Sequence, residues 1–152
     1  METLKILLVE DDHVQAEEIR EDLEEALSNV EYKIEMIDSE QGFYNRLDTI
    51  EVDAPDLIIM DVMLRWAHPS PEIAAPAEVI VGKHYRAGFR CLKRLAERQT
   101  ARRINVILYT VLQKRDDIEN EVRALPPNVV YLVKEPNHSP FIRTVRSLLV
   151  NP

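Results

Sequence analysis

The chain has 152 residues, of which 45% are apolar, and its formal net charge at pH 7 is −8. This length and composition suffice for one domain with a continuous core and leave little room for two. The negative charge argues against direct DNA binding, since no basic stripe offsets it. No apolar stretch approaches the roughly 20 residues that span a bilayer, and no basic-then-apolar leader opens the chain, so we expect a cytoplasmic protein without membrane contact.

Five short apolar runs, rich in β-branched residues or leucine, are strand candidates. They cover residues 4–9, 33–37, 57–60, 104–109 and 129–133. Most of these runs are continuous rather than alternating in polarity. Continuous apolar runs are typical of strands that are buried on both faces of a parallel sheet.

Between and after these runs, apolar residues recur at the spacing of one helix face, which predicts five amphipathic helices. The apolar positions are Ala16, Ile19, Leu23, Ala26 and Leu27; Phe43, Leu47 and Ile50; Phe89, Leu92, Leu95 and Ala96; Ile118, Val122 and Leu125; Phe141, Ile142, Val145, Leu148 and Leu149. Five strand–helix units with right-handed crossovers predict an α/β fold. We expect a flavodoxin-like, doubly wound, five-stranded parallel sheet in the order 2-1-3-4-5, with helices on both faces.

Residues 65–84 interrupt this alternation. They include Pro69, Pro71 and Pro76 and lie between a strand and a helix that normally join through a few residues. We interpret them as an insertion within a single domain that covers residues 1–152. Since the last helical pattern ends close to the end of the chain, we expect no second, output-type domain.

Polar residues follow the ends of four predicted strands: Glu10, Asp11 and Asp12, then Asp61, Thr110 and Lys134. In an open parallel sheet, ligands bind at this edge. Each residue alone has a simpler explanation, because Asp12 with Gln15 resembles a helix capping box, and Asp61 or Thr110 could cap the next helix. For Asp12 we prefer the cap. For the others, their joint placement favours a functional site.

The acids at this edge suit magnesium chemistry. Crowded carboxylates raise one another's pKa values unless a divalent cation neutralises them. All-oxygen ligands suit Mg²⁺, which keeps several waters and can exchange them for phosphate oxygens. Lys134 and Thr110 could bind a further phosphoryl oxygen. Asp61 stands alone after the third predicted strand and is the natural nucleophile, since carboxylates form aspartyl-phosphate intermediates.

The motifs LLVED, PDLIIMDVML, VILYT and YLVKEP, in this order, resemble those of the receiver domain of two-component response regulators. The resemblance covers nearly the whole chain apart from the insertion. It implies that Glu10, Asp11 and Asp61 bind Mg²⁺ together with the backbone carbonyl of Met63. It also implies that Asp61 is phosphorylated from the phosphohistidine of a sensor histidine kinase or of a histidine phosphotransfer protein.

The resemblance implies that Thr110 and Tyr131 are switch residues, whose side chains move on phosphorylation. It also implies that Lys134 is the counter-ion of the phosphoryl group. A tyrosine packed at the edge of the core is the alternative for Tyr131. Phosphorylation would repack the surface of the fourth helix, fifth strand and fifth helix for signalling to an unknown downstream protein. A homodimer through that surface is left open. Such a chain is a phosphoacceptor with autophosphorylation and autodephosphorylation chemistry only, and not an enzyme.

Two departures from the family pattern stand close to the expected site. The family usually has proline directly after the turn beyond the phosphoacceptor, where this chain reads Leu64, Arg65 and Trp66. After the lysine the family usually has proline at once, whereas here Glu135 comes before Pro136. We therefore expect the connection to the third helix and the loop after the lysine to differ from those of the family.

Two other functions remain open. One is a protein-interaction module of the same fold that works without phosphorylation. The other is a metal-dependent phosphatase with an aspartyl-phosphate intermediate. Such phosphatases commonly need a second aspartate two residues beyond the nucleophile, where this chain has Met63. A flavin carrier is disfavoured, because no Ser/Thr/Gly-rich phosphate loop follows the first strand.

We assign no functional role to the single cysteine, the single tryptophan or the histidines. Cys91 lies in a helical pattern and is expected to be a buried thiol. Trp66 is expected to be buried beneath the insertion. The histidines show no metal-ligand spacing and are expected to be solvated or incidental; they are His13, His68, His84 and His138.

Overall fold

The computed structural model describes residues 2–67, 75–78, 86–98, 104–113 and 118–150. Within these residues, five strands form one parallel sheet in the order β2-β1-β3-β4-β5. The strands are β1 (Leu4–Val9), β2 (Tyr32–Ile37), β3 (Leu57–Met60), β4 (Asn105–Thr110) and β5 (Val129–Val133). The predicted fold class and strand order are confirmed, and the bounds of β2 and β4 differ by one residue from those expected.

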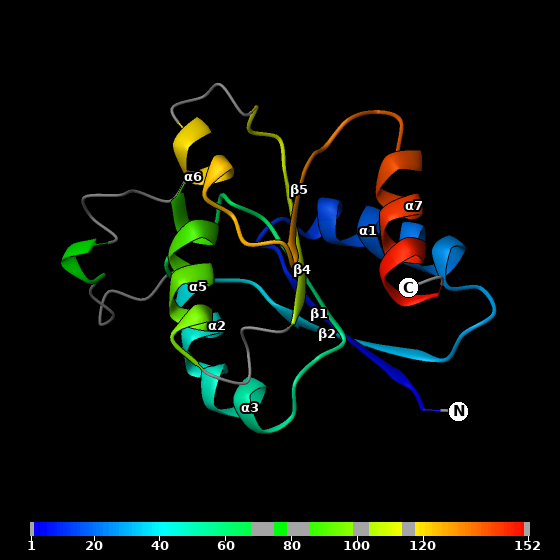
Figure 1. Ribbon diagram of the computed structural model, residues 1–152, viewed down its shortest axis with the longest axis horizontal. Coiled ribbons are helices and arrows are strands. Elements are labelled where there is room, and N and C mark those ends of the chain that lie inside the picture. The colour runs from blue at the N-terminus through cyan, green and yellow to red at the C-terminus, as the bar shows by residue number, and fades with distance from the viewer. Residues whose placement is uncertain (1, 68–74, 79–85, 99–103, 114–117, 151–152) are drawn as a thin grey trace.

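Helices cover both faces of the sheet (Figure 1). On one side lie α1 (His13–Ala26) and α7 (Ser139–Leu149). On the other lie α2 (Glu40–Asn45), α3 (Leu47–Val52), α5 (Ala87–Ala96) and α6 (Glu119–Arg123). In the part of the chain that the structure describes, no helix is long and apolar enough to span a bilayer.

Each face of the sheet has its own apolar core because successive side chains of a strand point to opposite faces. On β1, Leu7 and Val9 pack toward α2, α3 and α5, whereas Ile6 and Leu8 pack toward α1 and α7. The central strand β3 is buried along its whole length. This double burial explains the continuous apolar runs of the central strands.

The register aligns the carboxyl ends of the strands. Val9, the last residue of β1, pairs with Ile37 at the end of β2 and with Met60 at the end of β3. At the other edge, Thr110 pairs with Val133, so β4 and β5 end level with each other. Residues that follow these strands therefore emerge along one rim of the sheet.

Two helices differ from the expected pattern. The segment after β2 forms two short helices that meet at Arg46, whose amide bonds to the Phe43 carbonyl at 3.0 Å, an i→i−3 turn. The apolar spacing does not reveal this break, since Phe43, Leu47 and Ile50 are buried on both sides of it. The helix α6 has only five residues, and Leu125 lies beyond its end.

Most of the predicted insertion at 65–84 falls outside the described residues, including Pro69, Pro71, His68 and His84. Its extent therefore stays a prediction. The described portion at its start, Arg65 to Ala67, runs beside α2. The amides of Glu40 and Gln41, at the start of that helix, donate to the carbonyls of Arg65 at 2.9 Å and Trp66 at 2.8 Å.

Candidate functional site

The ammonium group of Lys134 joins two carboxylates that follow different strands. Its Nζ atom lies 2.5 Å from Oε1 of Glu10 and 3.1 Å from Oδ2 of Asp61, and it also donates to Oε1 of Gln15. Glu10 is only 2% exposed and Asp61 only 7%. The three bonds use all three ammonium protons. A single positive charge thus neutralises part of a buried pair of acids.

The backbone of the sheet fixes where these three residues stand. The amide of Glu10 donates to the last carbonyl of β2 and the amide of Asp61 to the last carbonyl of β1, both at 3.0 Å. The amide of Lys134 donates to the last carbonyl of β4 at 2.7 Å. The ladder of hydrogen bonds therefore extends one residue beyond each strand, and the three side chains start from a rigid edge.

The two buried carboxylates receive further hydrogen bonds from backbone amides. Asp12 N–H donates to Oε2 of Glu10 at 3.2 Å, and Met63 N–H donates to Oδ1 of Asp61 at 2.9 Å. Burial raises the pKa of Glu10 to about 7, and the neighbouring Asp61 carboxylate adds to this rise. Lys134 and the Asp12 amide oppose the rise in the pKa but do not cancel it.

Asp11 stands at the same rim but faces the loop after β3. Its Oδ2 atom accepts a hydrogen bond from the amide of Arg65 at 2.9 Å. Across the described residues, no group of three or more His, Cys, Asp and Glu side chains is arranged to hold a metal ion. The predicted metal ligands Glu10 and Asp61 both bind the ammonium of Lys134, and their role as metal ligands stays a prediction.

The two predicted switch residues both bond to the loop after β4. Thr110 is completely buried, and its Oγ1 atom accepts a long hydrogen bond of 3.4 Å from the amide of Leu112. The hydroxyl of Tyr131 donates to the carbonyl of the same Leu112 at 2.7 Å. Leu112 therefore links the side chains of Thr110 and Tyr131.

Solved receiver domains resemble this chain over nearly its whole length. The receiver domain of a signal transduction histidine kinase from Syntrophus aciditrophicus is 25% identical, with a TM-score of 0.66, and the match covers 98% of this chain and 92% of that one. The chain has the fold of a response-regulator receiver domain.

Two further receiver structures match similarly. The receiver domain of sensor histidine kinase PA1611 from Pseudomonas aeruginosa PAO1, solved with a magnesium ion in its active-site cleft, is 20% identical over 97% of this chain and 98% of that one, with a TM-score of 0.65. The phosphorylated cyanobacterial phytochrome response regulator RcpA is 23% identical over 97% and 91%, with a TM-score of 0.62. No family model and no curated protein matches the sequence.

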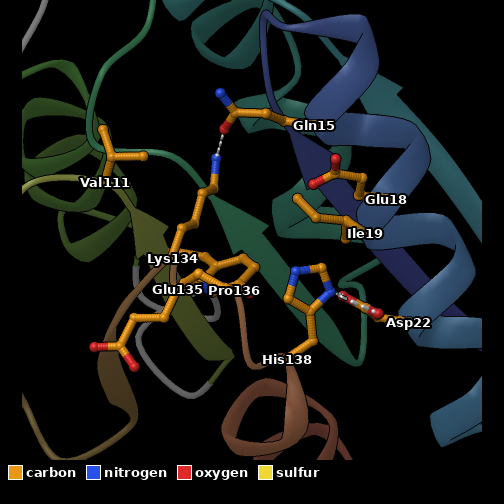
Figure 2. Close-up of a pocket in the computed structure, with 10 residues that line it drawn as sticks. Gln15, Glu18, Ile19, Asp22, Val111, Lys134, Glu135, Pro136 and His138 are labelled. Atoms are coloured by element: carbon orange, nitrogen blue, oxygen red, sulfur yellow. Dashed lines mark hydrogen bonds and ion pairs between the residues drawn. The ribbon is translucent and has the colours of Figure 1, made fainter.

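Beside the lysine of this receiver fold lies a cavity of about 400 Å³ between α1 and the loop after β5 (Figure 2). Figure 2 shows Lys134 reaching across to Gln15, with Val111 on the far side of the lysine. The acidic side chains of Glu18 and Asp22 come from α1, and that of Glu135 comes from the loop. The charged part of the lining is therefore mainly acidic, with Lys134 as its one certain cation and a histidine beside it, and the rest of the lining is neutral or apolar.

That histidine corrects one expectation. His138 was expected to be solvated or incidental, but its Nδ1 atom lies 2.9 Å from Oδ2 of Asp22. The contact joins the start of α7 to α1 and lines the cavity (Figure 2). Metal-ligand spacing does not reveal such a contact, and a pair between residues so far apart in the chain leaves no local pattern.

Asp12 caps α1 as expected, since its carboxylate accepts from the amides of Val14 and Gln15. The capping role expected for Gln15 is wrong, because its side chain binds Lys134. Gln15 is therefore a residue of the site that was not predicted from the sequence. Its position in the first turn of α1, at the rim, was the available signal, and the capping explanation concealed it.

Cys91 is fully buried, as predicted, and burial raises the pKa of its thiol well above the usual value. The indole ring of Trp66 lies against Tyr44 of α2, with ring centroids 5.8 Å apart. Its Nε1 atom is buried and has no hydrogen-bond partner among the described residues. Trp66 therefore belongs to the packing around α2.

Proposed function

We propose that this chain is a phosphoacceptor that receives a phosphoryl group on Asp61 from the phosphohistidine of a histidine kinase or of a histidine phosphotransfer protein. The observation that carries the proposal is the half-buried ammonium of Lys134, which bonds both Glu10 and Asp61 at the carboxyl edge of a receiver-type sheet. This cation is positioned to neutralise a phosphoryl group attached to the neighbouring aspartate.

The donor atoms fit Mg²⁺. Glu10, Asp11 and Asp61 would supply carboxylate oxygens, and Met63 would supply a backbone carbonyl, which is the all-oxygen set that this ion prefers. The raised pKa of Glu10 indicates that Lys134 alone does not neutralise the buried acids. When bound, Mg²⁺ would offset the charge of these carboxylates and of the phosphoryl oxygens.

The two oxygens of Asp61 have different partners, which assigns their roles. Oδ1 is held by the amide of Met63, and Oδ2 is held by Lys134. We assign the attack on phosphorus to Oδ2: the new O–P bond forms as the P–N bond of the donor histidine breaks, and the imidazole leaves with the electron pair. Lys134 then pairs with a phosphoryl oxygen.

The signal would leave the site through the loop after β4. Attraction of the Thr110 hydroxyl to a phosphoryl oxygen would break its weak bond to the Leu112 amide and release the loop that also holds Tyr131. The surface of α6, β5 and α7 would then change for an unidentified protein partner or a second copy of the chain.

One observation favours a second candidate, a receiver-like interaction module that works without phosphorylation. Lys134 already bonds both Glu10 and Asp61, so the acids have a counter-ion without any metal. No comparable observation favours a phosphatase, because Met63 stands where the second aspartate of such an enzyme would be.

A mass measurement distinguishes the two candidates. The protein is incubated with Mg²⁺ and acetyl phosphate or a phosphohistidine donor, and its intact mass is recorded. The phosphoacceptor gains one phosphoryl group, and Asp61→Asn gains none while keeping its fold. A wild-type mass that does not change in the presence of either donor contradicts the proposal and supports the interaction module.

A further inference from the structure

Arg65 follows Asp61 by four residues, at the position where the family usually has proline. Proline has no N–H group, so a proline here could not donate a hydrogen bond. The amide of Arg65 does donate one, to Oδ2 of Asp11 at 2.9 Å. The departure from the family pattern therefore adds a hydrogen bond to one of the proposed metal ligands.

The side chain and carbonyl of Arg65 are held as firmly as its amide. Its Nε atom donates to the carbonyl of Asp38 and its Nη2 atom to the carboxylate of the same residue, both at 3.1 Å. Its carbonyl accepts from the amide of Glu40, the first residue of α2, at 2.9 Å. Contacts on three sides orient the amide before any ligand binds.

The start of α2 is itself anchored to α5. Glu40 is completely buried, and its carboxylate receives two hydrogen bonds from Arg90, at 2.7 and 2.8 Å, and one from the hydroxyl of Tyr44. Such a bidentate pair fixes both side chains in one geometry. The segment that carries Arg65 therefore lies on a rigid support.

We propose that Arg65 is a positioning residue for Asp11, an inference that rests on the Mg²⁺ site of the proposed function. Its amide holds Oδ2 of Asp11, so Oδ1 would be the oxygen that binds the cation. Hydrogen bonds to ligating carboxylates orient them, and the loss of such a bond typically weakens metal binding about tenfold or more. The start of the 65–84 segment is in this way part of the metal site.

Two substitutions separate the amide from the side chain. Arg65→Ala keeps the N–H group and loses the contacts with Asp38, whereas Arg65→Pro loses both. Mg²⁺ is titrated into each purified protein by isothermal calorimetry. We expect Arg65→Pro to bind Mg²⁺ about tenfold more weakly than Arg65→Ala. In the background of Asp11→Ala, the two variants should bind Mg²⁺ equally.

Equal Kd values for the two Arg65 variants, or a persisting difference in the background of Asp11→Ala, would overturn the role of Arg65 while leaving Mg²⁺ binding by the wild type intact. A wild type that binds no Mg²⁺ would overturn both this inference and the metal site of the proposed function.

A spectroscopic test does not need the proline variant to fold. In ¹⁵N-labelled protein, Asp11→Asn should move the amide proton resonance of Arg65 upfield and speed its exchange with solvent, because a charged acceptor is lost. Mg²⁺ should move the same resonance in the wild type. An Arg65 amide that responds to neither change contradicts the inference.

Discussion

The Nζ atom of Lys134 lies 2.5 Å from Oε1 of Glu10, although 124 residues separate the two in the chain. The Glu10 side chain is buried and that of Lys134 is only 12% exposed, and Asp61 shares the same ammonium group. One positive charge facing two carboxylates leaves a net negative charge in a poorly solvated place. Burial, together with this imbalance, raises the pKa of Glu10 and makes the stability of the metal-free protein depend on pH.

The pKa of Glu10 is about 7 in the folded protein, against an ordinary value of 4.5. Between these values the folded state binds more protons than the unfolded state, so the free energy of unfolding must fall as pH rises through this window. We expect Glu10→Gln to remove this component, which amounts to about 3 kcal/mol. Urea unfolding without Mg²⁺, at a series of pH values, measures it; identical pH profiles for wild type and Glu10→Gln would contradict the assignment.

Gln15 supplies the third acceptor for the Lys134 ammonium. In Gln15→Leu one ammonium proton of the half-buried Lys134 loses its partner, which should lower the free energy of unfolding by about 1–3 kcal/mol. Glu17, which is exposed on the same helix, provides a matched control. Glu17→Leu should change stability by no more than about 0.5 kcal/mol. Equal stability losses in the two variants would argue against a role for Gln15 at the lysine.

Gly88 lies where α5 packs closely against the backbone of Asp61 and Val62. A Cβ atom there would come within 2.7 Å of the Val62 Cα and 2.8 Å of the Asp61 carbonyl oxygen, both backbone atoms. We expect Gly88→Ala to destabilise the fold by about 1–3 kcal/mol through overpacking, measured by denaturant unfolding.

Gly42 provides the control for this substitution. A Cβ atom at Gly42 would lie 3.0 Å from atoms of two side chains, Ile37 and Ser39, which can adjust. The helix propensity of alanine also offsets part of the cost, by up to about 1 kcal/mol. Gly42→Ala should therefore lower the stability less than Gly88→Ala does. A larger loss for Gly42→Ala would contradict the close packing around Gly88.

The buried pair of Glu40 and Arg90 supports the segment that carries Arg65. Arg90→Met leaves the Glu40 carboxylate buried without its cation, which should cost about 3–5 kcal/mol of stability. Arg94 pairs with Glu78 at the surface, with side chains 43% and 44% exposed, so Arg94→Met should cost no more than about 1 kcal/mol. Thermal unfolding of both variants tests this contrast, which similar shifts in Tm would refute.

Much of the fold was predictable because its signals are local and repeated. The central strands are buried on both faces and read as continuous apolar runs, and the helices repeat apolar residues at helical spacing. The break between α2 and α3 left no such signal, since the apolar spacing of Phe43, Leu47 and Ile50 continues across it.

Only those site residues that directly follow a strand could be predicted from the sequence. Parallel strands bring their carboxyl ends to one rim, which placed Glu10, Asp61 and Lys134 together in advance. The contacts of Gln15 with Lys134 and of Arg65 with Asp11 arise from tertiary packing between distant segments. For Gln15 the only signal was its position in the first turn of α1, and the capping-box pattern accounted for it; the contact of Arg65 leaves no signal, because a backbone amide carries no side-chain pattern.

The most direct test of the central claim locates the phosphoryl group itself. The protein is treated with Mg²⁺ and acetyl phosphate, the acyl phosphate is reduced with borohydride, and the reduced residue is found by peptide mass mapping. The account predicts homoserine at position 61 and its absence when Mg²⁺ is withheld. Reduction at Glu10 or Asp11 instead, or at no residue, would contradict the account.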